Sequence, residues 1–131
     1  SAMFPGSTLG DALQAVPLAD GGQDLFIQTD KFHAQFAADL PADQAALMAA
    51  TQRPVTYAAL AEPTTAAAWR SLPSYFVYGS EDLNIPPAVL DFMAERAQAR
   101  ETRVLEGASH AVMVSHPTEV ARVIIDAARA R

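Results

Sequence analysis

Asp82 and His110 are the residues in this sequence whose types and positions best suit acid–base chemistry. Asp82 lies in "GSEDLNIPP", three residues after Gly79, and His110 lies in "EGASHAVMVSHP", three residues after Gly107. A carboxylate bonded to an imidazole fixes the ring tautomer and stabilises the imidazolium that forms when histidine takes a proton from a nucleophile. The two residues therefore predict general-base catalysis, provided that the fold brings them together.

The elements around these residues predict a β-α-β-α unit over residues 73–131. The short apolar runs "SYFVYG" and "TRVLEG" favour buried strands. "PPAVLDFMAERAQA" between them predicts a helix that begins at its prolines, and "PTEVARVIIDAARA" predicts a terminal helix. Strands that alternate with helices in this way indicate a parallel pair in an α/β fold.

Both candidate residues follow the carboxyl end of a predicted strand, which is where open α/β sheets bind their ligands. Taken singly, each has a simpler explanation. An aspartate after a strand is often a turn or helix-capping residue, and a lone histidine in a small-residue loop is often structural or exposed. Occurring together, in this order and on adjacent strands, the pair favours function.

The chain before the first predicted strand divides into three parts. Residues 1–3 have the composition of a tag remnant, and residues 4–24 contain "FPGSTLG" and "ADGGQD", which predict a linker or loop. Residues 25–72 predict a helical region, because Phe32 and Phe36 are four residues apart in "TDKFHAQFAADL" and the alanine-rich "PADQAALMAATQ" follows.

Several of these segments together resemble the C-terminal part of the α/β-hydrolase fold, and most of all the small-esterase group of salicylate esterases and plant hydroxynitrile lyases. The segments are "LPSYFVYGSEDLNIPP", "FMAERAQA" and "GASHAVMVSHP". Upstream, "LPADQAALMAATQRPVTYAAL" resembles the helical cap of that group, and "TAAAWRSLPS" its return into the sheet. The resemblance implies an incomplete α/β-hydrolase fold, with a cap before two parallel strands, in which Asp82 is the triad acid and His110 the triad base.

The third member of such a triad, the nucleophile, is absent from the sequence pattern. The family order is nucleophile, acid, base, yet no G-x-S-x-G motif occurs. In "GSTLG" at 6–10 the serine stands one place early, and no strand precedes it. The resemblance places the nucleophile and the oxyanion-hole loop upstream of residue 4, so we expect the segment alone to be inactive, with truncation or proteolysis favoured over a natural split.

The resemblance also suggests residues for an apolar substrate pocket beneath the cap. These are Phe32, Phe36, Met48, Trp69 and Met113. Ordinary core packing explains each of them equally well. The motif "GASHAVMV" does not separate hydrolysis of a small ester from a hydroxynitrile-lyase-like reaction, so both alternatives stay open.

Composition excludes several other classes of function. The net charge of −6 disfavours nucleic acid and anionic membranes as partners. The chain has no cysteine, and its three histidines show no metal-binding spacing, so we expect no metal; triad chemistry needs no cofactor. No apolar run reaches the roughly 20 residues that span a bilayer, and no signal peptide is evident, so we expect a cytoplasmic protein.

The predicted parallel pair of strands also predicts that the chain associates with another chain. Two parallel strands are marginal alone, and the apolar "SYFVYG" would expose an edge that invites pairing with another chain. We therefore expect a homodimer, or association with the missing half of the fold. The alternative to an enzyme segment is a non-catalytic interaction or dimerisation module that has inherited an idle acid and base.

Overall fold

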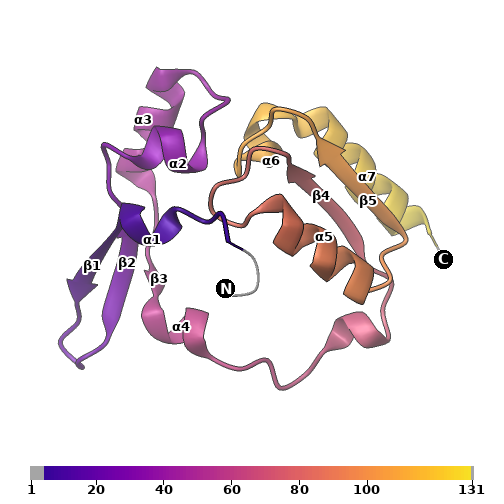
Figure 1. Ribbon diagram of the computed structural model, residues 1–131, viewed down its shortest axis with the longest axis horizontal. Coiled ribbons are helices and arrows are strands. Elements are labelled where there is room, and N and C mark those ends of the chain that lie inside the picture. The colour runs from indigo at the N-terminus through magenta and orange to yellow at the C-terminus, as the bar shows by residue number, and fades with distance from the viewer. Residues whose placement is uncertain (1–4, 131) are drawn as a thin grey trace.

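A computed structural model describes residues 5–130, which fold into an N-terminal group of elements and a C-terminal group joined by a long exposed segment (Figure 1). The expected tag remnant at 1–3 lies outside the described residues. In the view of Figure 1 the N-terminal group lies to the left and the C-terminal group to the right. No helix among residues 5–130 is long and apolar enough to cross a bilayer.

The N-terminal group is a three-stranded antiparallel sheet with four helices around it. Its elements are α1 (Leu9–Ala12), β1 (Leu13–Pro17), β2 (Gln23–Ile27), α2 (Phe32–Phe36), α3 (Ala42–Thr51), β3 (Val55–Thr56) and α4 (Tyr57–Ala61). The sheet order is β1-β2-β3, with Leu13 opposite Ile27.

The prediction of a linker or loop over residues 4–24 is wrong for most of that stretch, because "ADGGQD" is the turn of a β-hairpin. The Leu18 N–H donates to the Gly22 carbonyl at 2.9 Å, and the Gly22 N–H donates to Asp20 Oδ1 at 2.9 Å. Gly21 supplies the left-handed backbone that the turn requires, at φ 85°. Glycine and aspartate therefore join two strands here.

The region 25–72 is also less helical than predicted. Val55 and Thr56 pair with β2 as β3, and the helix α4 begins only at Tyr57. Thr56 ends the strand and caps the helix, since its hydroxyl accepts the Ala59 N–H at 3.2 Å.

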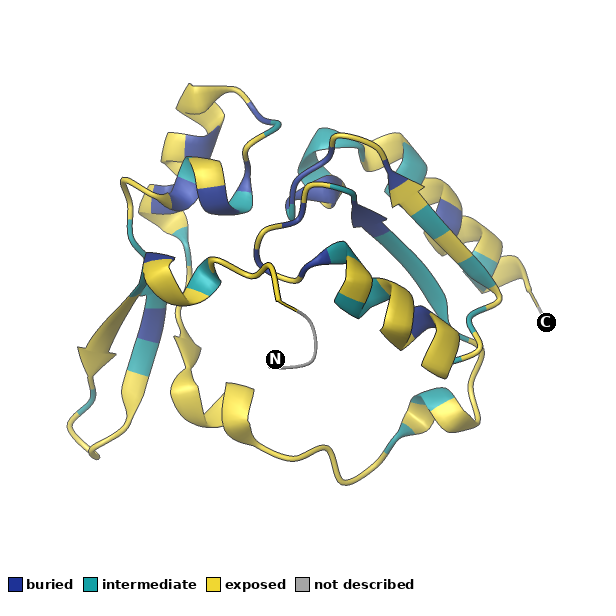
Figure 2. Cartoon of the chain, viewed as in Figure 1, coloured by how far each residue is buried: buried dark blue, intermediate teal, exposed yellow. Residues whose placement is uncertain are grey.

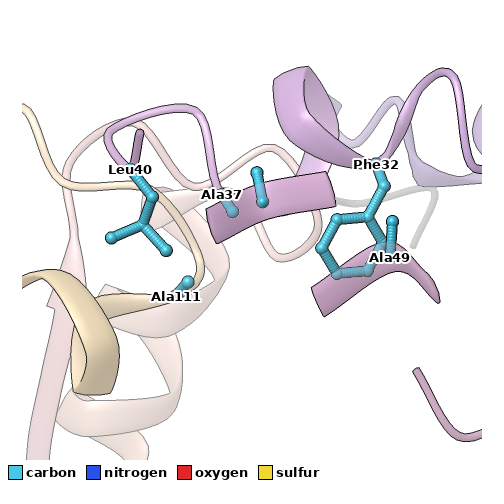
Figure 3. Packing of buried hydrophobic residues seen from close by; sticks show 6 residues of the cluster. Phe32, Ala37, Leu40, Ala49 and Ala111 are labelled. Atoms are coloured by element: carbon cyan, nitrogen blue, oxygen red, sulfur yellow. The ribbon is translucent and has the colours of Figure 1, made fainter. Parts of the chain in front are cut away.

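A shared apolar core joins the two groups of elements. Phe32, Ala37, Leu40 and Ala49 of the N-terminal group pack with Ala111, which lies in the loop after His110 (Figure 3). The Ala111 N–H donates to the carbonyl of Phe36 at 3.1 Å. Small alanine side chains let the backbones approach, and this packing fixes the histidine loop against α2.

The C-terminal group confirms the predicted parallel pair. Its elements are the 3₁₀ turn η1 (Ala68–Arg70), β4 (Tyr75–Gly79), α5 (Pro87–Arg96), β5 (Glu101–Leu105), α6 (Val112–Ser115) and α7 (Pro117–Arg129). β4 and β5 run parallel, from Tyr75 opposite Glu101 to Gly79 opposite Leu105. In Figure 1, α5 lies in front of this sheet and α7 behind it.

Much apolar surface of the C-terminal group is exposed. Among the described residues β4 pairs only with β5, so each strand keeps one free edge. On α7, Ile124 is 62% exposed, and on β5, Val104 is 47% exposed. Figure 2 shows most of α7 and the segment between α4 and η1 as exposed. Part of the apolar surface of these elements is therefore not covered by other elements of the C-terminal group.

Candidate acid–base site

Asp82 and His110 meet at the carboxyl ends of β4 and β5, as their positions in the sequence predicted. Asp82 Oδ2 lies 2.7 Å from His110 Nδ1. The other carboxylate oxygen, Oδ1, accepts the backbone N–H groups of Asn84 and Ile85, each at 2.9 Å. The Asp82 side chain is 4% exposed and that of His110 is 27% exposed. The acid is thus buried and held rigidly, while the imidazole is open on one side.

Close backbone contact between the two loops sets this geometry. The Glu81 N–H donates to the Ala108 carbonyl at 3.0 Å, and the Gly107 N–H donates to Ser80 Oγ at 2.8 Å. Gly79 makes the approach feasible, because a Cβ placed there would lie 2.0 Å from the Ala108 oxygen. In the sequence, Gly79 marks only the end of a predicted strand, and no local pattern indicates this role.

The arrangement prepares His110 to accept a proton at Nε2. An ionised carboxylate only accepts hydrogen bonds, so the Nδ1–H must be on the ring and must point at Asp82. The neutral imidazole then carries its free lone pair on Nε2. The Phe36 ring packs edge-on against the imidazole, with ring centroids 4.9 Å apart, and limits its rotation. This is the geometry of a general base with its orienting acid.

A buried glutamine that no motif in the sequence indicates ties the loop after Asp82 to α2. Gln35 is 6% exposed, and its Nε2 donates to the Leu83 carbonyl and to Asn84 Oδ1, both at 3.0 Å. Its Oε1 accepts the Thr8 hydroxyl at 2.8 Å. Gln35 lies next to Phe36 on a short helix. A polar residue on the buried face of such a helix needs hydrogen-bond partners, and this was the signal in the sequence that could have identified it.

Asp39 and Ser109 form a second polar contact, between the histidine loop and the segment after α2. Ser109, 2% exposed, donates its hydroxyl to Asp39 Oδ1 at 2.5 Å. Burial acts to raise the pKa of Asp39, but hydrogen bonds from the Ser109 and Ser115 side chains and from the backbone outweigh it and lower the pKa below its ordinary value. Asp39 is therefore a charged anchor for the residue before His110.

An apolar cavity of about 470 Å³ is lined in part by Phe36, the ring that contacts His110, although neither His110 nor Asp82 lines the cavity. Phe32, Phe36 and Met48, three of the predicted pocket residues, line it. Phe36 also contacts His110, so the cavity and the base share one wall. Most of the remaining lining is aliphatic, with Arg53, Gln52, Thr51 and Asn84 as its polar members.

The structure does not bring Trp69 and Met113 into this cavity. Trp69 precedes β4, whereas Asp82 follows it, so the two residues lie at opposite ends of that strand. Trp69 lines a different cavity, with three arginines. Met113 lies on α6 and is 53% exposed. A role of these two residues in substrate binding therefore stays a prediction, without support from this cavity.

No serine within residues 5–130 is hydrogen-bonded to His110. Ser80 accepts the Gly107 N–H, Ser109 donates to Asp39, and Ser115 lies 2.9 Å from His116 Nδ1. No group of three or more His, Cys, Asp or Glu side chains in the described part of the chain could hold a metal ion. Among the described residues, the Asp82–His110 pair is therefore without a hydrogen-bonded serine.

Comparison with known proteins points to one family. A family model described as "Alpha/beta hydrolase family" matches residues 2–123. Over 54 residues, 41% of this chain and 21% of the relative, the sequence is 41% identical to a pimeloyl-[acyl-carrier protein] methyl ester esterase of Aeromonas salmonicida (strain A449).

Solved structures show the same fold. The crystal structure of polyneuridine aldehyde esterase matches 95% of this chain and 51% of its own length, with a TM-score of 0.75 and 18% identity. A methylesterase from Arabidopsis matches 96% of this chain and 55% of its own, with a TM-score of 0.72 and 16% identity. The chain thus spans about half the length of these structures.

Proposed function

This chain belongs to the alpha/beta hydrolase family, and from that premise we propose that it supplies the base and the acid of a serine ester hydrolase. The observation that carries the proposal is the 2.7 Å contact between Asp82 Oδ2 and His110 Nδ1, and an apolar cavity lined by the neighbouring Phe36 ring supports it. The nucleophile comes from a part of the protein outside these 131 residues, since no G-x-S-x-G motif occurs among them.

The proposed reaction uses His110 twice. Its Nε2 takes the proton of the serine hydroxyl as the oxygen attacks the ester carbonyl, and then returns that proton to the departing alcohol oxygen. In the second half, water replaces the alcohol: the same nitrogen takes a proton from the water that attacks the acyl carbonyl, and returns it to the serine oxygen as the bond to the acyl group breaks and the carboxylic acid leaves. Asp82 stays ionised throughout and stabilises the imidazolium that forms in each step.

The cavity favours small esters with an apolar acyl or alcohol group. Its volume of about 470 Å³ falls in the range of ordinary small-molecule sites. The Phe36 ring lines this cavity and also contacts His110, which supports the cavity as the place where the apolar group of the ester binds. Two of the similar proteins are named as methyl ester esterase and methylesterase, which supports an ester substrate.

A fluorophosphonate probe tests the proposal, because it labels only an activated serine. We expect the 131-residue chain to show no mass increase and no turnover of a short-chain p-nitrophenyl ester. A longer protein that contains this segment should be labelled and should turn over the ester. There, His110→Ala or Asp82→Asn should lower kcat by roughly 10³–10⁴-fold. Stoichiometric labelling of the 131-residue chain would refute the external nucleophile.

A hydroxynitrile-lyase-like reaction is the alternative within the family, since the same base can act on a cyanohydrin. Supplying a cyanohydrin to the unlabelled longer protein separates the two reactions: release of cyanide without ester turnover would favour the lyase. Turnover of the ester alone would favour the hydrolase.

A non-catalytic interaction module is the second candidate, and the open edge of β4 favours it. In this case the chain joins a second copy of itself, or the other half of a hydrolase fold, through β4 and the exposed α7. Light scattering at micromolar concentration tests self-association, and a strictly monomeric chain would contradict it. A longer protein that pairs β4 internally and hydrolyses esters would leave no role for the module.

A further inference from the structure

We propose that a second pocket, at the amino-terminal ends of β4 and β5, binds a phosphate group. This pocket has a volume of about 410 Å³ and is formed by η1, the C-terminal end of α5 and the turns that lead into the two strands. Trp69, Gln98 and the arginines Arg70, Arg96 and Arg100 line it. It lies at the opposite end of β4 from Asp82, so it is independent of the acid–base site.

The charge of the pocket is opposite to that of the protein. The chain carries a net charge of −6, yet three of its nine Lys and Arg residues line this one pocket. Within residues 5–130, Arg103 is the only arginine that pairs with a carboxylate, and it does so with Glu101. Arg70, Arg96 and Arg100 are therefore unpaired although the chain is rich in acids, and their mutual repulsion favours an anion between them.

Trp69 orders two of these arginines. The guanidinium carbon of Arg70 lies 5.3 Å from the centroid of the Trp69 ring, and that of Arg96 lies 5.0 Å from it. Such cation–π contacts hold the planar guanidinium against an aromatic ring while its N–H groups remain available as donors. The arginines are thus partly preorganised for a ligand.

Gln98 occupies a backbone conformation that would suit glycine better. Its φ is 50°, in the left-handed region, at the turn that follows α5. There its N–H donates to the Glu95 carbonyl at 2.9 Å and the Ala99 N–H donates to the Ala94 carbonyl at 3.0 Å. A side chain at this position costs stability, and here it places an amide on the pocket wall.

These donors match a phosphate better than a carboxylate. Each guanidinium presents up to five N–H donors in a rigid fork, and a carboxylate offers only two oxygens and one negative charge. A phosphate group offers more acceptor oxygens and, near neutral pH, between one and two negative charges. The ligand is either free inorganic phosphate or the phosphoryl group of a small ester.

Trp69 is the only tryptophan, so its fluorescence reports directly on the pocket. We would titrate the chain with inorganic phosphate and with phenyl phosphate, at constant ionic strength, and follow the emission. We expect a saturable change. Tighter binding of phenyl phosphate would assign the site to phosphate esters, and equal or weaker binding would assign it to the free anion.

Two double variants distinguish specific binding in this pocket from a general effect of positive charge on the protein. Arg96→Gln with Arg100→Gln should weaken phosphate binding at least tenfold. Arg122→Gln with Arg129→Gln removes the same charge from α7, away from the pocket, and should leave binding unchanged. Equal weakening by both variants, or a response that sodium chloride reproduces at matched ionic strength, would overturn the proposal.

Gln98→Gly gives a second, independent readout. The substitution relieves the left-handed strain and removes the amide, so it should raise the urea midpoint of unfolding while weakening phosphate binding several-fold. If the variant were more stable but bound phosphate with unchanged affinity, Gln98 would not be part of the site. If Arg70→Gln also bound phosphate as the unaltered chain does, the proposed site would be wrong.

Discussion

Gly79→Ala should destabilise the protein by about 2–4 kcal/mol, because the new methyl group has no space. Its Cβ would lie 2.0 Å from the Ala108 oxygen and 2.5 Å from the Ser109 oxygen, where ordinary contact begins at 3.4 Å. Both neighbours are backbone atoms, so no side chain can rotate away. Overpacking of this kind costs about 1–3 kcal/mol, and the separation also breaks the Glu81–Ala108 hydrogen bond, worth about 1 kcal/mol.

The same separation should disconnect the candidate acid and base. Asp82 follows Gly79 by three residues, and His110 follows Ala108 by two, so moving the two backbones apart lengthens the 2.7 Å contact. In proton NMR spectra, we expect the downfield resonance of the His110 Nδ1–H in the unaltered chain to be lost from the variant. A purely local packing defect would leave that resonance in place.

Urea unfolding followed by Trp69 emission and circular dichroism measures the change in stability. Gly10→Ala is the matched control, because nothing lies within 4 Å of a Cβ at Gly10 in α1. Alanine there should be neutral or stabilise by up to about 1 kcal/mol. A Gly79→Ala protein as stable as the unaltered chain would refute the close-approach explanation of the site.

Three further outcomes test other contacts. Burial and the hydrogen bond to Asp91 raise the pKa of Tyr78 from 10.0 to about 12, so stability should fall by about 2 kcal/mol between pH 10 and 12 as the tyrosinate forms. Unfolding of Tyr78→Phe across that range should lack this loss. Ser109→Ala should cost about 1.5–3 kcal/mol. The lowered pKa of Asp39 stabilises the fold above about pH 3.8, and this stabilisation disappears as the pH falls. Ser109→Ala removes one of the hydrogen bonds that lower this pKa, so the variant should also unfold at a higher pH during acid titration. Thr56→Ala, which removes the cap of α4, should cost about 1 kcal/mol in urea, whereas Thr56→Ser should cost little.

Local patterns in the sequence were sufficient to predict the fold of the C-terminal group. The apolar run of β4, the prolines before α5 and the order of the elements predicted a parallel pair, and β4 and β5 form it. Asp82 and His110 could be paired from the sequence because both follow a strand end, and parallel strands place those ends together. The N-terminal hairpin was missed because glycine and aspartate signal a tight turn and a linker alike, and only strand pairing separates the two.

Contacts between segments distant in the sequence decided the rest. The sequence alone determined the family resemblance, the candidate acid and base, and the lack of a nucleophile motif. Only the tertiary structure showed that Gly79 must be glycine, that Gln35 secures the acid loop and that Trp69 faces arginines at the far end of β4. Periodicity and motifs report which face a residue occupies within its own element. Which residues meet depends on how those elements pack, since close approach and charge are properties of the assembled chain.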